Sequence, residues 1–368
     1  MSGLTINLPA QNAGGFATHP GLRRWRAARA KVLFGSADAQ IACVGDSETM
    51  GTGGSGTAYV NGAVYAYPRR LASALTSAGL PAAETSCFGD HRIGFTSFLT
   101  YDTRVLAPSA WVEFMADGPG GYYFFNNTDA NALSFAPVPA FDNMILWDTT
   151  NSAYCAWGMN VDGGATIATL TPTGSTRLRR TVETCALATH TINIIKSGTL
   201  NLNLVFNGWD TFDSTTHRVR VHSLSGSGWQ ASQVVGAAGV SAPLPFYTSI
   251  APDLFLIYLG TNEYVNNITP AAFTAAMQTL ISACLVIGDV VLIAPAFAST
   301  AYPQVTQQAI INCCYALATQ YSLPLLDLSK RFGLWVDGNA SGMYYDVDHM
   351  SGAGYLDIAA SISNILMQ

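Results

Sequence analysis

The chain has 368 residues and a mass of 39.0 kDa, which predicts one large domain or two of medium size. Hydrophobic residues make up 49% of it and charged residues only 11%, so the composition supplies ample apolar surface for a core and excludes a largely disordered chain. The net charge is −6 and only 17 residues are Lys or Arg, which argues against a nucleic-acid binder, because such proteins neutralise phosphates with clustered basic side chains.

Membrane insertion and classical export also find no support in the sequence. No apolar run reaches the roughly 20 residues that a membrane-spanning helix needs, so no membrane span is predicted. The N-terminus has neither the basic start nor the apolar stretch of a signal peptide. The seven cysteines lack Cys-x-x-Cys spacing, which favours buried free thiols over a disulfide scaffold or a zinc site. We therefore expect a soluble protein without a classical signal peptide, either cytoplasmic or carried on a virion, as a phage tail protein is.

The first hundred residues predict a leader followed by alternating helices and strands. Residues 1–18 are polar and unpatterned, so they are expected to be a leader or linker. Apolar side chains recur at helical spacing over 19–34, and 40–45 is a short apolar run ending in glycine, as a buried parallel strand does before a loop. A further helix is predicted over 67–80, with Gly79 as its end.

The pattern changes between residues 109 and 220. Short segments of alternating polarity are separated by Gly, Asn, Asp and Pro at intervals of roughly 8–12 residues, which is typical of a β-sandwich. Residues 159–164 contain Asp-Gly-Gly and predict a hairpin turn. We therefore expect an inserted all-β domain of jelly-roll or sandwich type over 109–220.

From residue 221 strands and helices alternate again, which predicts a parallel sheet covered by helices on both faces. The chain is thus expected to be an α/β protein whose discontinuous main domain consists of 19–108 and 221–368. The predicted elements of its second part are strands at 253–260, 289–294 and 324–328, and helices at 270–285, 302–321 and 352–367.

Polar motifs follow two of the predicted strands and precede the last helix. Ser47 comes after the strand at 40–45, Asn262 after the strand at 253–260, and Asp346 and His349 before the terminal helix. Loops at the carboxyl ends of parallel strands meet at one edge of a sheet, so these side chains are expected to share a pocket.

Each of these residue types suits a step of acyl transfer. A serine hydroxyl can attack a carbonyl, and an asparagine amide can donate to the developing oxyanion without bringing a charge. Asp346, three residues before His349, can hold the imidazole Nδ1–H and leave Nε2 free as a general base, although Asp348 is a competing partner. Each motif alone also fits an ordinary turn or cap, and only their combination is specific.

The combination resembles the SGNH (GDSL-like) hydrolase family over about residues 20–108 and 220–368. The resemblance implies a flavodoxin-like parallel sheet and ester hydrolysis without a metal or another cofactor. The segments that carry it are GDSETMG at 45–51, LGTNEY at 259–264 and DVDHMSGAGY at 346–355.

The resemblance also implies a role for each motif residue. Ser47 would be the nucleophile, His349 the base and Asp346 the acid that orients it. The oxyanion hole would consist of the Ser47 backbone N–H, the Asn262 side chain and the backbone N–H of a glycine.

Two segments compete to supply that glycine. The segment around Gly228 stands in the family's order but has Ser223 where the family has Asn and Ser225 where it has its first Gly. The rival is Gly89, which follows the first long helix as a second strand would. We favour Gly228. A further departure is Glu263, where many members have Asp, and it is expected to alter the support of the loop rather than the chemistry.

The predicted insertion resembles the carbohydrate-binding-like modules found in some family members. Four successive aromatic residues at 122–125 place two rings on the face opposite the core, so at least some of them should be exposed, where they would suit stacking on sugar, or should cover the catalytic domain. We therefore expect a serine esterase that removes short acyl groups, acetyl above all, from a small-molecule or polysaccharide ester. The alternatives are a catalytically silent carbohydrate-binding or adhesion protein on the same scaffold, and a lipase or thioesterase.

Overall fold

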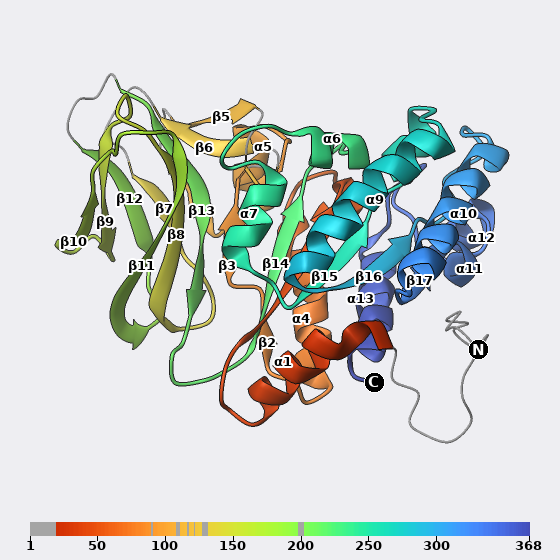
Figure 1. Cartoon of the computed structure of the whole chain (residues 1–368), viewed down its shortest axis with the longest axis horizontal. Coiled ribbons are helices and arrows are strands. Elements are labelled where there is room, and N and C mark those ends of the chain that lie inside the picture. The colour runs from red at the N-terminus through yellow and green to blue at the C-terminus, as the bar shows by residue number, and fades with distance from the viewer. Residues whose placement is uncertain are drawn as a thin grey trace.

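The computed structural model describes residues 20–89, 91–107, 111–115, 118–120, 122–126, 132–197 and 202–368. Within these residues, a parallel sheet with helices on both faces forms one part of the molecule, and two antiparallel sheets form the other (Figure 1). The predicted leader at 1–18 lies outside the described residues.

The parallel sheet has the strand order β17-β16-β15-β1-β14-β2. With the short edge strand β2 set aside, the chain order of the other five reads 2-1-3-4-5 across the sheet, which is the flavodoxin-like order predicted. The direction of winding reverses between β1 and β15, and ligands of such sheets bind outside the carboxyl ends of the strands at that reversal. The strands are β1 (Ala39–Gly45), β2 (Ala82–Ala83), β14 (Val219–Ser225), β15 (Leu254–Tyr258), β16 (Asp289–Ala294) and β17 (Leu325–Asp327).

Both faces of this sheet are buried, which explains why its strands are apolar without alternation. Ile41 and Cys43 of β1 belong to the core on one face, and Ala42 and Val44 to the core on the other. The helices α1 (Arg23–Leu33), α4 (Tyr67–Ser77) and α13 (Gly352–Leu366) cover the first face. The second face is covered by α6 (Ala231–Gly236), α7 (Pro243–Ile250), α9 (Pro270–Ile287) and α10 (Gln304–Tyr321).

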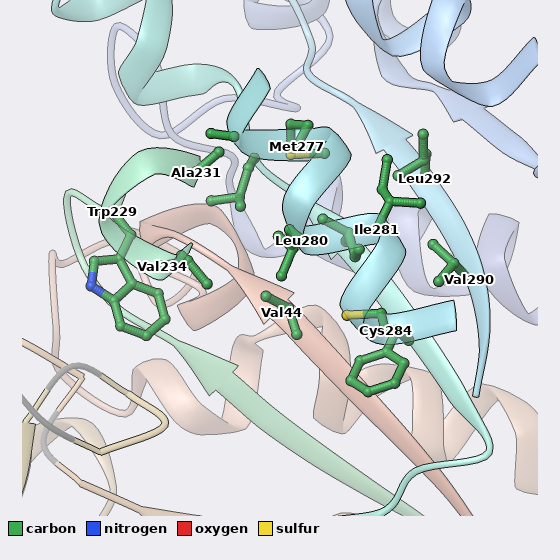
Figure 2. Close-up of a cluster of buried hydrophobic side chains, with 14 of the residues drawn as sticks. Val44, Trp229, Ala231, Val234, Met277, Leu280, Ile281, Cys284, Val290 and Leu292 are labelled. Carbon is green, nitrogen blue, oxygen red and sulfur yellow. The ribbon is translucent and has the colours of Figure 1, made fainter. Parts of the chain in front are cut away.

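Helix α9 packs one apolar stripe on the second face. Figure 2 shows its Leu280 pointing toward Val44 of β1, beside Ile281 and Cys284 of the same helix. By length and composition alone α9 could cross a membrane, the one such helix among the described residues. All seven cysteines, Cys284 included, are free, as predicted.

Shorter helices connect these elements. They are the 3-10 helix Pro20–Leu22, α2 (Ser47–Met50), α3 (Gly62–Tyr65), α5 (Phe95–Tyr101), α8 (Thr261–Val265), α11 (Leu328–Phe332) and α12 (Trp335–Ala340).

The antiparallel part consists of two sheets that enclose a common core of aromatic and aliphatic side chains, which includes Phe124, Trp157 and Trp209. The predicted all-β segment is thus present, while its jelly-roll topology stays a prediction. One sheet is built from β3 (Ser86–Phe88), β5 (Val112–Met115), β6 (Tyr122–Asn126), β8 (Phe141–Thr150), β11 (Arg177–Ala188) and β13 (Leu204–Phe212). The other is built from β4 (Val105–Leu106), β7 (Leu133–Phe135), β9 (Ala156–Val161), β10 (Thr166–Leu170) and β12 (Ile192–Ser197).

Two of these strands precede residue 109, where the insertion was predicted to begin. β3 pairs with β13, and β4 pairs with β7, so both belong to the antiparallel sheets rather than to the α/β part. They are three and two residues long and carry no alternating pattern of their own. The predicted hairpin turn is confirmed, because β9 and β10 pair around Asp162 and Gly163, which have φ angles of 55° and 70°.

The two parts pack tightly against each other. The indole of Trp147 on β8 donates to the Ser249 hydroxyl of α7 at 3.0 Å, and its ring lies 5.4 Å from that of Phe88. Arg220 of β14 forms buried ion pairs with Asp210 of β13 and with Asp38. The antiparallel sheets are therefore fixed against the parallel sheet rather than tethered to it.

The aromatic run at 122–125 lies differently from the expectation. Phe124 stacks on Trp209 inside the sandwich, and Tyr123 and Phe125 lie on the opposite face, as alternation requires. These three side chains are all buried, however, because the opposite face packs with Val205 and Tyr154. The predicted exposure of aromatic rings for sugar stacking is thus wrong for these three positions, and the Tyr122 side chain lies outside the described residues.

Candidate active site

The end of β1 places Ser47 at the reversal point of the sheet. Asp46 caps the following short helix α2, with its Oδ1 accepting from the Glu48 N–H at 3.0 Å. Gly45 is required here, since a Cβ would lie 2.6 Å from the Tyr258 carbonyl of the neighbouring strand and would also overlap Thr49. Ser47 is consequently held in a tight strand-to-helix turn beside the end of β15.

Asn262 lies in α8, directly after β15, and its amide reaches the same turn. Its Nδ2 donates to Asp46 Oδ2 at 3.1 Å and to the Trp229 carbonyl at 3.1 Å. Gly260, with a φ of +129°, allows the sharp bend that turns α8 back over the strand. The structure therefore brings the Asn262 amide to the turn that carries Ser47.

The segment before α13 completes the group. His349 Nε2 lies 3.0 Å from Ser47 Oγ, across 302 residues of sequence. Its Nδ1 lies 2.9 Å from Asp346 Oδ2, while Asp346 Oδ1 accepts from the backbone N–H groups of Asp348 at 3.0 Å and His349 at 2.8 Å. The contacts with the carboxylate require a proton on Nδ1, and whenever Nε2 carries none, its lone pair faces Ser47 Oγ and can accept the serine proton.

Electrostatics distinguish the two carboxylates beside His349. Burial raises the pKa of Asp346, but the hydrogen bond and charge of His349 outweigh it and hold this pKa below its ordinary value. Asp348 Oδ1 lies farther from Nδ1, at 3.3 Å, and burial together with Asp346 raises its pKa. Asp346 is thus the ionised partner of the imidazole.

His349 itself is subject to opposing influences. Burial lowers its pKa, but the Asp346 hydrogen bond and the charges of Glu48, Asp348 and Asp346 together raise it to about 9. Part of this rise comes from the charge of Glu48, so the affinity of the imidazole for a proton depends on whether Glu48 is ionised.

The loop that carries Gly228 crosses the top of β1. Gly226 N donates to the Gly45 carbonyl at 3.1 Å, and Trp229 provides the carbonyl that Asn262 contacts. Gly228 has a φ of +72°, and open space surrounds the position of its missing Cβ. Its N–H forms no hydrogen bond with the other described residues.

The rival glycine lies close to the same loop. Gly89 follows β3 with a φ of 62°, and the nearby His91 is bonded to this loop twice. The His91 carbonyl accepts from Ser227 N at 2.8 Å, and the His91 Nδ1 lies 2.7 Å from the Ser225 carbonyl. Both candidate segments thus lie beside the site.

Three buried carboxyl groups lie near Ser47, and sequence reasoning predicted the burial of none of them. Asp46 and Glu263 are inaccessible to solvent, and burial raises the pKa of each to about 7. Glu263 Oε1 accepts from the N–H of Ala231, the first residue of α6, at 2.6 Å, which is the loop support expected of this position. Glu48 is fully buried, and the only signal for it was an acidic residue directly after the serine of the GDSE motif.

Asp346, Asp348 and His349 are also the one group of potential metal ligands found in the described part of the chain. Their ligand atoms already bond to one another, as an acid–base pair does. Beside them lies a mainly apolar pocket of about 150 Å³, and its wall residue Trp335 donates from Nε1 to the Asp346 carbonyl at 3.1 Å.

No family model matches the chain, and no curated protein matches it in sequence. Solved structures do match. A peptidoglycan O-acetylesterase is 16% identical, with a TM-score of 0.71 over 94% of this chain and 95% of its own.

Two further matches score lower. A lipase/acylhydrolase from Enterococcus faecalis is 22% identical over 40% of this chain and 75% of its own, with a TM-score of 0.34. A family two carbohydrate esterase from Cellvibrio japonicus is 10% identical over 77% and 98%, with a TM-score of 0.30. The first match spans nearly the whole of both chains, so at the level of the fold it confirms the predicted resemblance: the chain has the fold of the SGNH (GDSL-like) hydrolases.

Proposed function

We propose that the chain is a serine esterase of the SGNH type, with Ser47 as its nucleophile. The observation that carries the proposal is the continuous hydrogen-bonded line from Asp346 through His349 to Ser47, with distances of 2.9 and 3.0 Å. Two segments, 302 residues apart at His349 and Ser47, supply these groups, and their order matches the transfer of a proton away from the serine hydroxyl.

The mechanism is acyl transfer in two halves. As Ser47 Oγ attacks an ester carbonyl, its proton moves to His349 Nε2, and Asp346 stabilises the imidazolium that forms. The tetrahedral intermediate collapses with transfer of that proton to the leaving alcohol. Water then attacks the acyl-enzyme, gives a proton to the same nitrogen, and releases the acid as the proton returns to Ser47.

The oxyanion of each half needs donors. We assign them to the N–H groups of Ser47 and Gly228 and to the Asn262 amide. Gly228 is preferred to Gly89 because its N–H has no acceptor among the described residues and the space beside it is open. The Asn262 amide donates to Asp46 and Trp229 in the resting state, so its role requires the exchange of one of these bonds for the substrate oxygen.

For the substrate we propose a short acyl ester, acetyl above all, on a carbohydrate. The support is the fold that the chain shares, over 94% of its length, with a peptidoglycan O-acetylesterase. The assembled triad disfavours the alternative of a catalytically silent binding protein, because a scaffold without activity has no need for a base aligned on its serine.

The test is the Ser47→Ala variant, assayed with p-nitrophenyl acetate and with an acetylated polysaccharide. Loss of the nucleophile should lower kcat by about 10⁴–10⁶, and a fluorophosphonate probe should label the wild type but not the variant. Ser36→Ala, which changes an exposed serine, is the matched control and should retain full activity. Activity of Ser47→Ala within about tenfold of the wild type would refute the mechanism.

Butyrate and octanoate esters separate the remaining alternative. A lipase or thioesterase should prefer them to acetate, whereas the proposed acetylesterase should lose activity as the chain lengthens.

A further inference from the structure

Glu48 follows the proposed nucleophile directly and is completely buried in α2. Neither of its carboxyl oxygens has a hydrogen-bond donor within reach in the described part of the chain. A buried carboxylate without donors loses its hydration and gains nothing in return, so such a group ordinarily takes up a proton instead.

The surroundings of Glu48 offer acceptors rather than donors. The hydroxyls of three buried tyrosines that interact electrostatically with Glu48 donate their hydrogen bonds to backbone carbonyls instead. A hydroxyl has one proton to donate, so these oxygens can only accept a bond from Glu48. The bonds they make run from Tyr264 to the Ala296 carbonyl at 3.3 Å, from Tyr344 to the Phe297 carbonyl at 2.7 Å, and from Tyr355 to the Thr52 carbonyl at 2.8 Å.

Among the charged groups around Glu48, His349 alone favours its ionised form. Burial raises the pKa of Glu48 well above its ordinary value, the positive imidazole and, to a smaller extent, the nearby Tyr355 hydroxyl lower it, and Asp46 and Asp348 raise it further. The titratable groups that act on Glu48, or on which it acts, come from every element packed around it and are Asp46, Tyr258, Tyr264, Tyr344, Asp348, His349 and Tyr355.

Glu48 and His349 thus share protons as a pair. With one proton between them, either the acid is neutral and the imidazole is neutral, or the acid is negative and the imidazole is positive. In the second form Nε2 carries a proton and cannot accept the one from Ser47.

We propose that Glu48 is a positioning residue for the esterase reaction: it keeps its proton in the resting enzyme and so leaves His349 uncharged and able to take the Ser47 proton. The inference rests on the proposed function. It explains why an acid stands beside the nucleophile without a single donor: a carboxylate fixed by donors would hold His349 in its charged, inactive form.

The first test measures the proton on Glu48 without any use of activity. Unfolding in urea is compared between the wild type and the isosteric Glu48→Gln variant from pH 5 to pH 7. Unfolded glutamate is ionised above about pH 4.3, so a wild type that folds with Glu48 protonated must release a proton on unfolding and loses stability as the pH rises.

The ratio of the wild-type to the variant unfolding constant should therefore grow about tenfold per pH unit. A ratio independent of pH would show that Glu48 is ionised in the folded state and would overturn the proposal. If Glu48→Gln fails to fold, Glu48→Met replaces it in the same comparison, because Met has a similar length and needs no hydrogen-bond partner.

The second test measures whether the protonation state of Glu48 affects the pKa of His349. The rate at which a fluorophosphonate probe labels Ser47 is measured against pH. Gln is neutral like the protonated acid it replaces, so the acid limb of the Glu48→Gln profile should stay within about 0.3 pH unit of the wild type, with the maximal rate kept within about tenfold.

Glu263→Gln is the matched control, since Glu263 is another buried acid near the site but is not among the groups that shift His349. It should leave the acid limb in place. A shift of the acid limb to lower pH in Glu48→Gln, without the same shift in Glu263→Gln, would show that an ionised Glu48 retains the imidazole proton in the wild type and would overturn the proposal. Failure to label the wild type at Ser47 would overturn the proposed function and the inference together, whereas normal labelling with a shifted limb overturns the inference alone.

Discussion

Asp346→Asn tests how the orienting carboxylate serves catalysis. An asparagine at this position keeps an oxygen for the backbone N–H groups of Asp348 and His349, which Asp346 Oδ1 contacts at 3.0 and 2.8 Å. Its amide nitrogen then replaces Oδ2, 2.9 Å from Nδ1 of the imidazole. An amide N–H cannot accept from Nδ1–H, so the ring adopts the tautomer with its proton on Nε2, where it can no longer take the serine proton.

The expected loss in kcat is about 10⁴, or roughly 5.5 kcal/mol of transition-state stabilisation, with little change in folding stability. The measurement is kcat for p-nitrophenyl acetate alongside the urea midpoint. Asp348→Asn is the matched control, because Asp348 Oδ1 is 3.3 Å from the same nitrogen and should cost less than tenfold. A loss of 10⁴ in Asp348→Asn with near-normal activity in Asp346→Asn would refute the assignment of the acid.

Three further outcomes follow from the geometry. Asn262→Ala removes one oxyanion donor and should lower kcat by about 10²–10³ with little effect on KM, and an unchanged kcat would remove Asn262 from the hole. The rate should rise with pH as His349 loses its proton. Because the Asp346 hydrogen bond and the charges of Asp346 and Asp348 raise the His349 pKa against burial, the midpoint of kcat/KM should lie above 6.5, and a lower midpoint would contradict the electrostatics. Leu280→Ala leaves a cavity between α9 and the sheet, where Leu280 is fully buried beside Val44 (Figure 2), and should cost about 2–5 kcal/mol in urea unfolding while the activity of the folded fraction persists.

The parallel sheet was largely predictable from sequence because its strands have a distinctive composition. A strand buried on both faces must be apolar throughout, and the runs predicted at 40–45, 253–260 and 289–294 correspond to β1, β15 and β16. The motif residues could be placed at one edge because each follows such a run. Gly45 shows the physical reason for the sharp boundary, since the neighbouring strand leaves no room for a side chain there.

The edges of the insertion could not be predicted in the same way. β3 is only three residues long, and what makes it a strand of the antiparallel part is its pairing with β13, more than a hundred residues later. The aromatic residues at 122–125 alternate as expected, but their burial depends on Val205 and Tyr154, which the local pattern does not reveal. Pairing and coverage of this kind are properties of the assembled sheets.

The buried acids of the site escaped prediction for a related reason. In sequence, Glu48 and Glu263 are polar residues in loops after strands, and such residues are usually solvated. Glu48 is buried beside Tyr344 and Tyr355, which come from the end of the chain, and Glu263 is buried where α6 packs beside α8. The chemistry-bearing motifs were visible because of their residue types, whereas the environment that tunes them comes from distant segments.

The position of the insertion in the chain has a consequence for the site. The antiparallel sheets enter just before β14, and β14 lies beside β1, so the loop that follows β14 reaches across the nucleophile turn. His91, from the segment after β3, holds that loop through Ser225 and Ser227 at 2.7 and 2.8 Å, and Gly226 in turn holds Gly45. The proposed oxyanion loop is thus fixed from both sides, by the parallel sheet and by the segment that leads into the insertion. Removal of the inserted sheets together with the segment that carries His91 should therefore affect the rate of the chemical step itself, and not only the binding of a large substrate, because it releases one of the two anchors of that loop.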